Sequence, residues 1–407
     1  MGGASSMEVG NVRLCHGEQF PLIAEPRMQG YAMGLRKNHR KTMETKSFKY
    51  KIYKLNENKQ KRLEELLRTA AWVYNHSLAV MRTYYRIYGK SISQARMQAH
   101  IAKMKHRCYP KWNDLNAQCA QQILDRIYEG YKKFFNKTAK HPPKFKNWRR
   151  YSSITYKQDG YTLNGNTLTL NKQKLRLRFH LSRPIEGKIQ TVCVSRDAVG
   201  DWWVSFTVRV NDTLSPTPPT GKAIGLDFGL HHFLTGSDGR RIESPQFLKE
   251  NLDELRKRQR DLSRKEKGSN SRKRARLEVA RLHRRISNQR TAFHWQLANE
   301  LAKEFDIICI ETLDIKSMKE RWGRKIGDLA FSDFVEILAT VCKKNGKRLV
   351  QIDKWEPTSK ICSVCGHKAE DLPLNIRKWM CPECGTRHDR DVNAAQNILK
   401  IGMGTPP

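Results

Sequence analysis

The sequence of 407 residues has no long apolar run and is poor in acidic residues. No stretch approaches the ~20 residues that a membrane-spanning helix requires, and the N-terminus has no apolar core of the signal-peptide type. Asp and Glu number 40 against 77 Lys and Arg, which gives a formal net charge of +37. Such a chain repels itself unless a polyanion neutralises it. This balance predicts nucleic acid as the partner rather than an anionic membrane surface, which usually attracts one short basic segment.

Cysteine is sparse outside one short segment near the C-terminus. Cys309 lies inside the apolar run "IICI" and is predicted to be a small buried hydrophobic residue. This usage favours a reducing compartment over an oxidised secreted scaffold, so we expect a cytoplasmic protein. The six cysteines that occur singly are Cys15, Cys108, Cys119, Cys193, Cys309 and Cys342.

The first half of the chain divides into a leader, a strand and a helical block. Residues 1–43 lack periodicity and predict a disordered leader. The segment "FKYKIYKL" then alternates apolar and basic residues, as a strand with one wet face does. Asn56 is placed to cap a helix that ends at Gly89, and "NAQCAQQILDRIYEGYKKFFNK" predicts a second helix. Residues 57–138 are therefore expected to be mainly helical.

Short strands dominate the next part of the chain. Residues 139–213 alternate apolar and polar positions between Gly and Asn turns, and together with 44–56 they predict a small β-barrel. The helical block would then be inserted between its first and second strands. A Pro- and Thr-rich linker at 214–221 marks the clearest domain boundary.

Strands and helices alternate after the linker, which predicts an α/β sheet with a parallel portion. Residues 247–300 predict a basic helical hairpin that turns at "KGSNS". Its leucines and isoleucines are spaced to pack, while its many basic residues are expected to contact phosphate or to lie solvated on the opposite face. The predicted packing stripe consists of Leu248, Leu252, Leu255, Leu282, Ile286, Leu297 and Leu301.

Three acidic residues occupy unusual positions in this second half. Asp227 interrupts the apolar strand "AIGLDFG", Glu311 follows "IICI", and Asp391 begins the helix "VNAAQNILK". Residues at the carboxyl ends of strands line the functional crevice of α/β sheets. Each acid also has a plain alternative: a partnered strand residue for Asp227, a solvent-facing one for Glu311, and a helix cap for Asp391.

Convergence of these acids would create a metal site. Two carboxylates 4 Å apart repel by about 4 kcal/mol at an effective dielectric near 20, and a cation relieves that cost. Hard oxygen ligands suit Mg²⁺ or Mn²⁺. Two such ions about 3.5–4 Å apart can clamp the attacking and leaving oxygens of a phosphodiester. The sequence therefore allows a two-metal site that acts on phosphate.

Four cysteines near the C-terminus form a separate motif. Cys362, Cys365, Cys381 and Cys384 have the spacing C-x₂-C-x₁₅-C-x₂-C, which is typical of a four-thiolate Zn²⁺ site. A glycine follows each pair directly, as a tight turn around a metal requires. Four thiolates complete the coordination shell, so the zinc is expected to be structural, with His367 and His388 as neighbours rather than ligands.

These segments together resemble the TnpB family of transposon-encoded, RNA-guided DNA endonucleases, which are related to the type V CRISPR effectors. The resemblance covers residues 44–400. It rests on "GLDFGLHHF", "IICIETL" and "PTSKICSVCG", and most specifically on "CPECGTRHDRDVNAAQNI". The N-terminal "AWVYNHSLA" and "YEGYKKFFN" are similar to the wedge and recognition regions of the family.

The resemblance implies an α+β multidomain protein of the prokaryotic cytosol or nucleoid. The implied wedge barrel comprises 44–56 and 139–213, with 57–138 as the helical recognition domain. An RNase H-like (RuvC) nuclease domain would then comprise 222–356 and 386–407, interrupted by a zinc ribbon at 357–385. The family's three metal-binding acids match Asp227, Glu311 and Asp391, and the resemblance favours Asp391 over Asp389 as the third.

The resemblance also implies a guide RNA and a short motif beside the DNA target, with base pairing supplying sequence specificity. Gln118 and Gln121 match the family's motif-reading helix, and Gln can bond adenine in the major groove. Ordinary solvated helix residues are the alternative. The segment "KSMKERWGRK" predicts a mobile basic loop over the active site, in which Trp322 either stacks on a base or packs on the domain surface. Its predicted nucleic-acid contacts are Lys316, Lys319, Arg321, Trp322 and Arg324.

Other functions remain compatible with the sequence. A nuclease-silent relative would bind its RNA-selected DNA site and act as a repressor. A transposase that joins strands would use the same metal chemistry, and a small type V CRISPR effector would differ only in genomic context. The presence of all three acids favours the endonuclease. Both a monomer and a homodimer are compatible with the chain.

Overall fold

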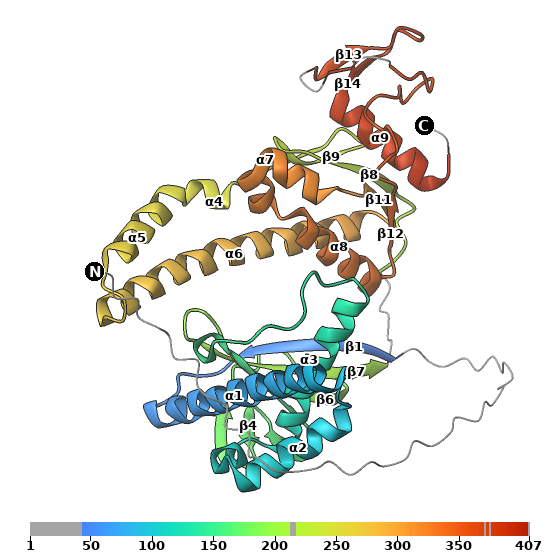
Figure 1. Ribbon diagram of the computed structural model, residues 1–407. Helices are drawn as coiled ribbons and strands as arrows, with labels where there is room; N and C mark the ends of the chain where they lie inside the picture. The colour runs from blue at the N-terminus through green and yellow to red at the C-terminus, as the bar shows by residue number, and fades with distance from the viewer. Residues whose placement is uncertain (1–42, 212–216, 370–371, 374–375, 406–407) are drawn as a thin grey trace, which may run out of the picture. The chain divides into compact units, whose positions relative to one another are not determined.

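The computed structural model describes residues 43–211, 217–369, 372–373 and 376–405 (Figure 1). The chain forms two compact units, Met1–Asp212 and Thr213–Pro407. The predicted leader of residues 1–43 lies outside the described residues except for its last position. Part of the predicted linker, residues 214–216, also lies outside them. No helix among the described residues is long and apolar enough to cross a membrane.

The first unit contains two antiparallel sheets. One has the strand order β1-β7-β6-β2 and the other β3-β4-β5. The strands predicted to form a barrel therefore lie in separate ladders, and a single bridge between Ile52 and Phe179 links them. The strands are β1 (Met43–Lys51), β2 (Ser153–Lys157), β3 (Tyr161–Asn164), β4 (Thr167–Leu170), β5 (Leu175–Arg178), β6 (Lys188–Arg196) and β7 (Trp202–Asn211).

Helices occupy the chain between β1 and β2, as the sequence predicts. Asn56 caps α1 (Glu57–Tyr88), and Gly89 ends it in the left-handed conformation with φ 63°. The predicted second helix is α3 (Ala117–Phe135), which packs on α1 and β2. A further helix, α2 (Gln94–Arg107), is capped by Ser93 and was not predicted. Short 3₁₀ turns are η1 (Pro110–Asp114), η2 (Trp148–Arg150) and η3 (Gln158–Gly160).

The second unit contains a five-stranded sheet in the order β10-β9-β8-β11-β12. β11 runs parallel to both β8 and β12, whereas β9 and β10 are antiparallel additions. The predicted parallel portion is therefore confirmed. The strands are β8 (Ala223–Phe228), β9 (His232–Gly236), β10 (Arg241–Glu243), β11 (Ile307–Glu311) and β12 (Arg348–Ile352).

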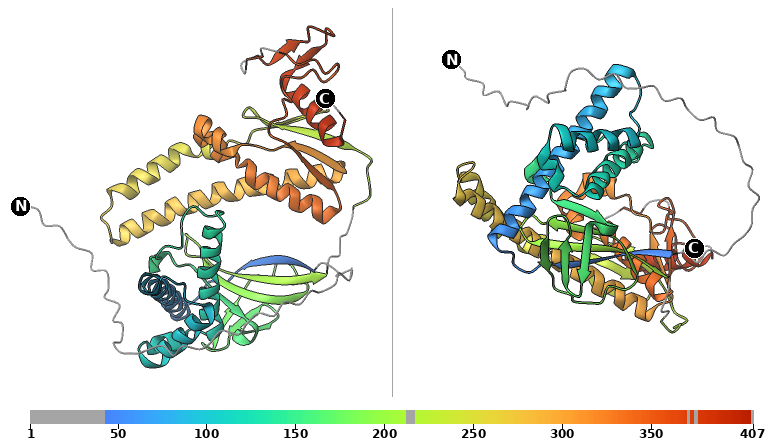
Figure 2. Two further views of the ribbon diagram at one scale, coloured as in Figure 1. Left: turned by 45° about the vertical axis from the view of Figure 1, so that its right-hand side comes forward. Right: turned by 90° about the horizontal axis from the view of Figure 1, so that it is seen from below.

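Helices connect these strands, and one of them lies where a loop was predicted. The hairpin of α5 (Leu252–Arg264) and α6 (Asn270–Glu304) turns at 265–269 and extends away from the sheet (Figures 1 and 2). Between β11 and β12 lie α7 (Ile315–Leu329) and α8 (Phe331–Asn345), and α4 (Phe247–Glu250) precedes the hairpin. The basic segment within α7 was predicted to be a loop, which is wrong. Asp314 accepts a hydrogen bond from the Ser317 N–H and so caps a helix, which is kinked at Gly323.

The hairpin divides its apolar stripe between two clusters. Leu255, Leu282 and Ile286 form a small cluster, with Leu248 packed against it. Leu297 and Leu301 instead join the main core of the unit. Aromatic rings fill that core, with Phe233 centred 5.3 Å from Phe331 and 5.2 Å from Phe334. The base of the hairpin is thus held by the core, while its basic faces stay exposed.

The last helix, α9 (Arg390–Met403), lies directly on β8 and β11. Glycine permits this contact: a Cβ at Gly225 would lie 2.1 Å from the backbone oxygen of Ala395. The predicted buried cysteine, Cys309, is fully buried and faces Gly402 of α9. A short hairpin of β13 (Lys378–Met380) and β14 (Arg387–Asp389) precedes α9. This docking determines where the first turn of α9 lies relative to the sheet.

Candidate active site and metal centre

Asp227 and Glu311 lie side by side at the carboxyl ends of neighbouring parallel strands. Asp227 is near the end of β8, and Glu311 is the last residue of β11. Leu226 pairs with Ile310 in the parallel register, so the next residue on each strand is Asp227 or Glu311. Residues in register point to the same face of a sheet, and strands lie about 4.8 Å apart. Both carboxylates therefore emerge at one edge of the sheet.

Asp391 lies in the first turn of α9, but it does not cap the helix. Asp389 is the cap, and its Oδ1 accepts hydrogen bonds from the N–H groups of Asp391 and Val392, at 3.2 Å each. The other carboxylate oxygen of Asp389 pairs with Arg241 at 2.6 Å. Asp389 therefore has the helix-cap role that was the alternative interpretation of Asp391. The Asp391 carboxylate instead lies 3.1 Å from the guanidinium of Arg377.

The three acids affect one another electrostatically. Burial is the largest cause that raises the pKa of Asp227 well above its ordinary value, and the charges of Glu311 and Asp391 raise it further. The guanidinium groups of Arg390 and Arg377 oppose these effects. Burial also raises the pKa of Glu311 to about 7. The structure therefore brings together the three acids that the sequence singled out, in surroundings that disfavour their combined charge.

The chemistry of this donor set fits a divalent cation. Carboxylate oxygens are hard ligands of the type that Mg²⁺ and Mn²⁺ prefer, and a cation would offset the raised pKa values. The carboxylates are not gathered tightly, however. Within the described part of the chain, only the four cysteines place three or more His, Cys, Asp or Glu ligand atoms within 4.8 Å of one another. Arg377 supplies positive charge to Asp391 in this arrangement.

The four cysteines converge with the dimensions of a zinc site. The sulfur atoms of Cys362 and Cys384 are 3.7 Å apart, and those of Cys365 and Cys381 are 3.6 Å apart. A tetrahedron with Zn–S bonds of about 2.3 Å places its sulfurs about 3.8 Å apart. A disulfide would require about 2.05 Å. The arrangement therefore fits Zn²⁺ bound by four thiolates.

The surroundings of the cysteines match the expected knuckle turns. Gly366 and Gly385 have φ values of 75° and 70°, which glycine adopts without strain. Each donates its N–H to the carbonyl of the first cysteine of its pair, at 3.0 and 2.9 Å. The Nε2 of His388 lies 3.0 Å from the Cys362 sulfur, so this histidine contacts the cluster from outside.

Amide side chains of α9 hold the first cysteine pair against the helix. Asn393 bonds the N–H of Ser363 at 2.8 Å and the carbonyl of Ile361 at 2.7 Å. Asn397 donates to the carbonyls of Thr358 and Ile361, both at 2.7 Å. Both asparagines lie in the segment "CPECGTRHDRDVNAAQNI", on which the family resemblance rests. Their spacing of four, on the helix that carries Asp391, is the signal that could have indicated one binding face.

The structure describes the side chains of only some of the predicted nucleic-acid contacts. Gln121 is exposed on α3, whereas the side-chain oxygen of Gln118 is buried without a hydrogen-bond partner. Both therefore remain predictions. The other predicted contacts lie on α7, and their side chains are outside the described residues: Lys316, Lys319, Arg321, Trp322 and Arg324.

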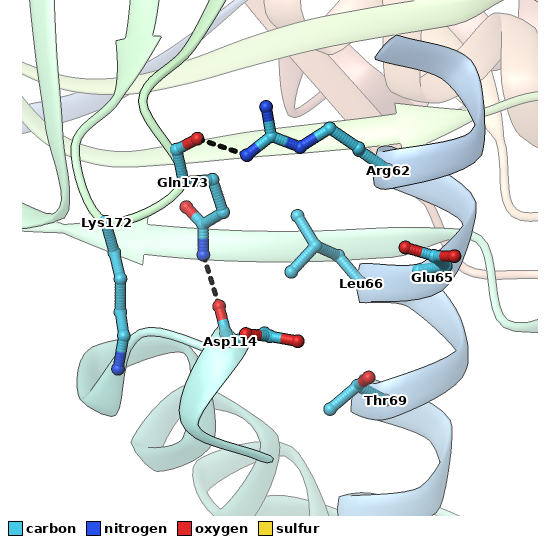
Figure 3. A pocket seen from close by; sticks show the side chains of 7 residues that line it. All are labelled: Arg62, Glu65, Leu66, Thr69, Asp114, Lys172 and Gln173. Atoms are coloured by element: carbon cyan, nitrogen blue, oxygen red, sulfur yellow. Dashed lines mark hydrogen bonds between the residues drawn. The ribbon is translucent and has the colours of Figure 1, made fainter. Parts of the chain in front are cut away.

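A pocket of about 250 Å³ in the first unit contains none of the predicted site residues (Figure 3). The backbone carbonyl of Gln173 accepts a hydrogen bond from Arg62 at 2.6 Å. The side-chain amide of Gln173 donates to the backbone carbonyl of Asp114 at 2.5 Å. Two cations and two carboxylates balance in charge around the pocket. Its lining is Arg62, Glu65, Leu66, Thr69, Asp114, Lys172 and Gln173. This mixed lining does not indicate one ligand.

Comparison with family models identifies two segments. Residues 205–321 match the OrfB_IS605 family, described as "Probable transposase". Residues 331–398, which include the four cysteines and Asp391, match the "Cas12f1-like, TNB domain". Together these segments contain all three acids and the cysteine cluster.

Similar proteins extend the match to most of the chain. A "Putative RNA-guided DNA endonuclease" of Streptomyces pristinaespiralis is 35% identical over 366 residues, covering 88% of this chain and 89% of that protein. The "Putative RNA-guided DNA endonuclease InsQ" of Escherichia coli K12 is 28% identical over 350 residues, covering 81% of this chain and 86% of that protein.

A solved structure shows the same fold at lower identity. The Cas12f1 protein in a complex with sgRNA and target DNA has a TM-score of 0.57 and 16% identity, covering 88% of this chain and 98% of that chain. The sequence likeness across nearly all of both chains is the stronger observation. On this ground, the chain belongs to the TnpB family.

Proposed function

We propose that the protein is an RNA-guided DNA endonuclease that hydrolyses phosphodiester bonds with two divalent cations. The observation that carries the proposal is the meeting of Asp227 and Glu311 at adjacent strand ends, with Asp391 close enough to raise the pKa of Asp227. Three acids in a chain of net charge +37 form an acidic site where a polyanion would bind. The names of the two relatives support the same activity.

Asp227, Glu311 and Asp391 would hold the cations. The bound Mg²⁺ or Mn²⁺ ions would activate a water and stabilise the leaving oxygen of the phosphodiester. The rigid strand ends hold two of the acids in register, where both side chains are half-buried and this burial raises their pKa values. Arg377, whose side chain is 55% exposed, neutralises Asp391 and is placed to transfer its contact to a phosphate when the site is loaded.

We assign domain roles from the same likeness. Residues 222–356 and 386–407 form an RNase H-like (RuvC) nuclease domain, whose sheet and α9 carry the acids. Residues 357–385 form a zinc ribbon with Zn²⁺ as a structural ion. Residues 44–56 and 139–213 form the wedge, and 57–138 the recognition domain. The linker spans 214–221.

The RNA partner follows from charge and from the relatives. Cations extend through both units, and the α5–α6 hairpin presents many of them, partly balanced by pairs such as Arg258 with Glu278 at 2.7 Å. Such a surface binds phosphate without reading sequence. A guide RNA would supply the sequence specificity by base pairing. Duplex DNA with a short flanking motif is the proposed target.

Two neighbouring acids provide a sharp test. Asp391→Asn removes a proposed metal ligand, whereas Asp389→Asn keeps a good helix cap. We expect Asp391→Asn to abolish Mg²⁺-dependent cleavage of guide-matched DNA while RNA and DNA binding persist. The Asp389→Asn control is expected to cleave. Normal cleavage by Asp391→Asn would refute the assignment, and tight programmed binding without cleavage by the wild type would indicate a repressor.

A further inference from the structure

A segment of the first unit lies along one face of α1 and is held there by specific contacts. The Asn75 side chain bonds both the carbonyl and the N–H of Lys146, each at 2.9 Å. Arg82 donates to the carbonyl of Pro143 at 2.8 Å. Residues 143–149, here named the strap, are therefore fixed against the helix at two points.

Aromatic rings remain exposed on the strap and on the helix beside it. Trp72 of α1 is 57% exposed, and Phe145 and Trp148 of the strap are 52% and 42% exposed. Trp72 shares its helix face with Arg68, four residues earlier, and with Asn75, three residues later. Two other rings are buried against the strap: Lys146 lies over Tyr74 and Tyr151, 4.4 and 5.5 Å from their centres, and each of these tyrosines is 4% exposed.

Guanidinium groups line the same rings. Arg68 lies 4.4 Å from the Trp148 ring centre, and Arg149 lies 5.2 Å from it. Arg82 lies 4.8 Å from the Phe145 ring centre. Cations stacked on aromatic rings are themselves flat surfaces on which a nucleobase can stack. The strap and α1 therefore present exposed flat groups, two of which have guanidinium groups against them.

This surface has no negative charge of its own. Residues 66–82 and 139–151 contain no Asp or Glu. In the part of the chain that the structure describes, none of the cations of this surface has a carboxylate partner. These cations are Arg68, Arg82, Lys144, Lys146, Arg149 and Arg150. The α5–α6 hairpin differs, because several of its arginines are paired with glutamates. The unpaired charge of the strap is available to phosphate.

We propose that the strap and the adjoining face of α1 stack unpaired nucleotides of the guide RNA. The proposal rests on the proposed function for the identity of that RNA. Exposed rings fit unpaired bases, since a duplex hides its base faces within its own stack. The surface is formed in the chain alone, which suits a resident RNA better than a DNA strand that separates only at the target.

Stacking can be tested with an unstructured oligo(A) RNA and the full chain, at raised salt to suppress phosphate contacts elsewhere. We expect Trp72→Ala and Trp148→Ala each to weaken binding about 10-fold. Trp148→Phe, which keeps a ring, should restore most of the affinity. Trp355→Ala is the control, because Trp355 is 80% exposed in the segment that follows β12, outside both the strap and the α5–α6 hairpin, and it should bind as the wild type does.

An abasic version of the oligonucleotide separates stacking from charge. Wild type should bind it about 10-fold less tightly than oligo(A), while Trp148→Ala should bind the two RNAs alike. Equal loss of both RNAs in Trp148→Ala would instead indicate a folding defect or a phosphate role and would overturn the stacking assignment. Wild-type affinity of both tryptophan variants for oligo(A) would also overturn it.

The source of the nucleotides can be identified by ultraviolet crosslinking of the complex formed with transposon-end RNA. Crosslinks between the strap and RNA before DNA is added support the proposal, and crosslinks only to added target DNA overturn it. Cleavage is scored in parallel. Absence of cleavage with normal strap crosslinks would contradict only the endonuclease, whereas normal cleavage without strap crosslinks would contradict only this inference.

Discussion

Gly225 offers a direct way to move one acid without touching any of them. A Cβ at this position would lie 2.1 Å from the backbone oxygen of Ala395 and 2.6 Å from the backbone nitrogen of Leu399. Atoms of the α9 backbone cannot rotate away as a side chain could. Since real Cβ contacts stay above 3.0 Å, Gly225→Ala should push α9 from the sheet by about 0.9 Å, the difference between 3.0 and 2.1 Å.

That displacement should affect cleavage more than stability. Overpacking of this kind typically costs about 1–3 kcal/mol, which the two-unit chain should survive. Asp391 lies one helical turn before Ala395, so it would shift relative to Asp227, and a misplacement of about 1 Å can cost 10²-fold in rate. We expect single-turnover DNA cleavage to fall about 100-fold, with only a modest decrease in melting temperature.

A second glycine provides the control for Gly225→Ala. A Cβ added at Gly327, in α7, would meet no atom within 4 Å, and this glycine has no positive φ. Gly327→Ala should therefore keep wild-type cleavage and gain up to about 1 kcal/mol of helix stability. Wild-type cleavage by a folded Gly225→Ala would refute the idea that close docking of α9 positions Asp391.

Three further predictions concern stability. The pKa of Glu311 is raised from 4.5 to about 7, so the metal-free protein should lose about 3 kcal/mol of stability as pH rises from 4.5 to 7. Denaturant unfolding should show that Mg²⁺ or Glu311→Gln lessens this loss. His76, buried beside His100, has a pKa lowered to about 4 from 6.5. The unfolded chain therefore binds the extra proton, and stability should fall by about 3 kcal/mol between pH 6.5 and 4, a decrease that His76→Gln should lessen. Asn397→Leu leaves the buried carbonyl of Thr358 without its donor, so we expect a loss of about 1–3 kcal/mol and faster release of zinc to a chelator.

The sequence predicted the helices whose ends are determined by residues within a few positions. Asn56 and Gly89 define α1 because a side-chain cap and a left-handed glycine act within a few residues. α2 was missed, since its buried apolar residues are only Met97 and Ile101 among many polar ones. The kinked helix α7 was taken for a loop because Gly323 and its basic neighbours obscure a stripe whose buried end, Ile326 and Leu329, packs into the core.

The candidate site shows the same division between local and distant causes. Strand-end positions of Asp227 and Glu311 could be predicted, because the apolar strands that precede them are local patterns. The residues alone did not predict that Asp389, and not Asp391, caps α9; only the family resemblance favoured Asp391 as the third acid. The division of roles between these two acids depends on Arg241, 148 residues from Asp389, and on Arg377, which contacts Asp391 from the segment that precedes β13. Such partners are set by the fold and leave no mark in spacing.

The position of Asp391 depends on two opposite faces of α9. Small residues on one face allow the helix to lie on the sheet, where Gly225 meets Ala395. Amides on the other face bond the backbone of the first cysteine pair, through Asn393 and Asn397. A segment as short as the ribbon buries too little apolar surface to order itself, whereas structural zinc contributes about 10–16 kcal/mol in small fingers. Zinc bound by the four thiolates would therefore order the surface that α9 contacts, and the cluster would help to hold the third carboxylate in place.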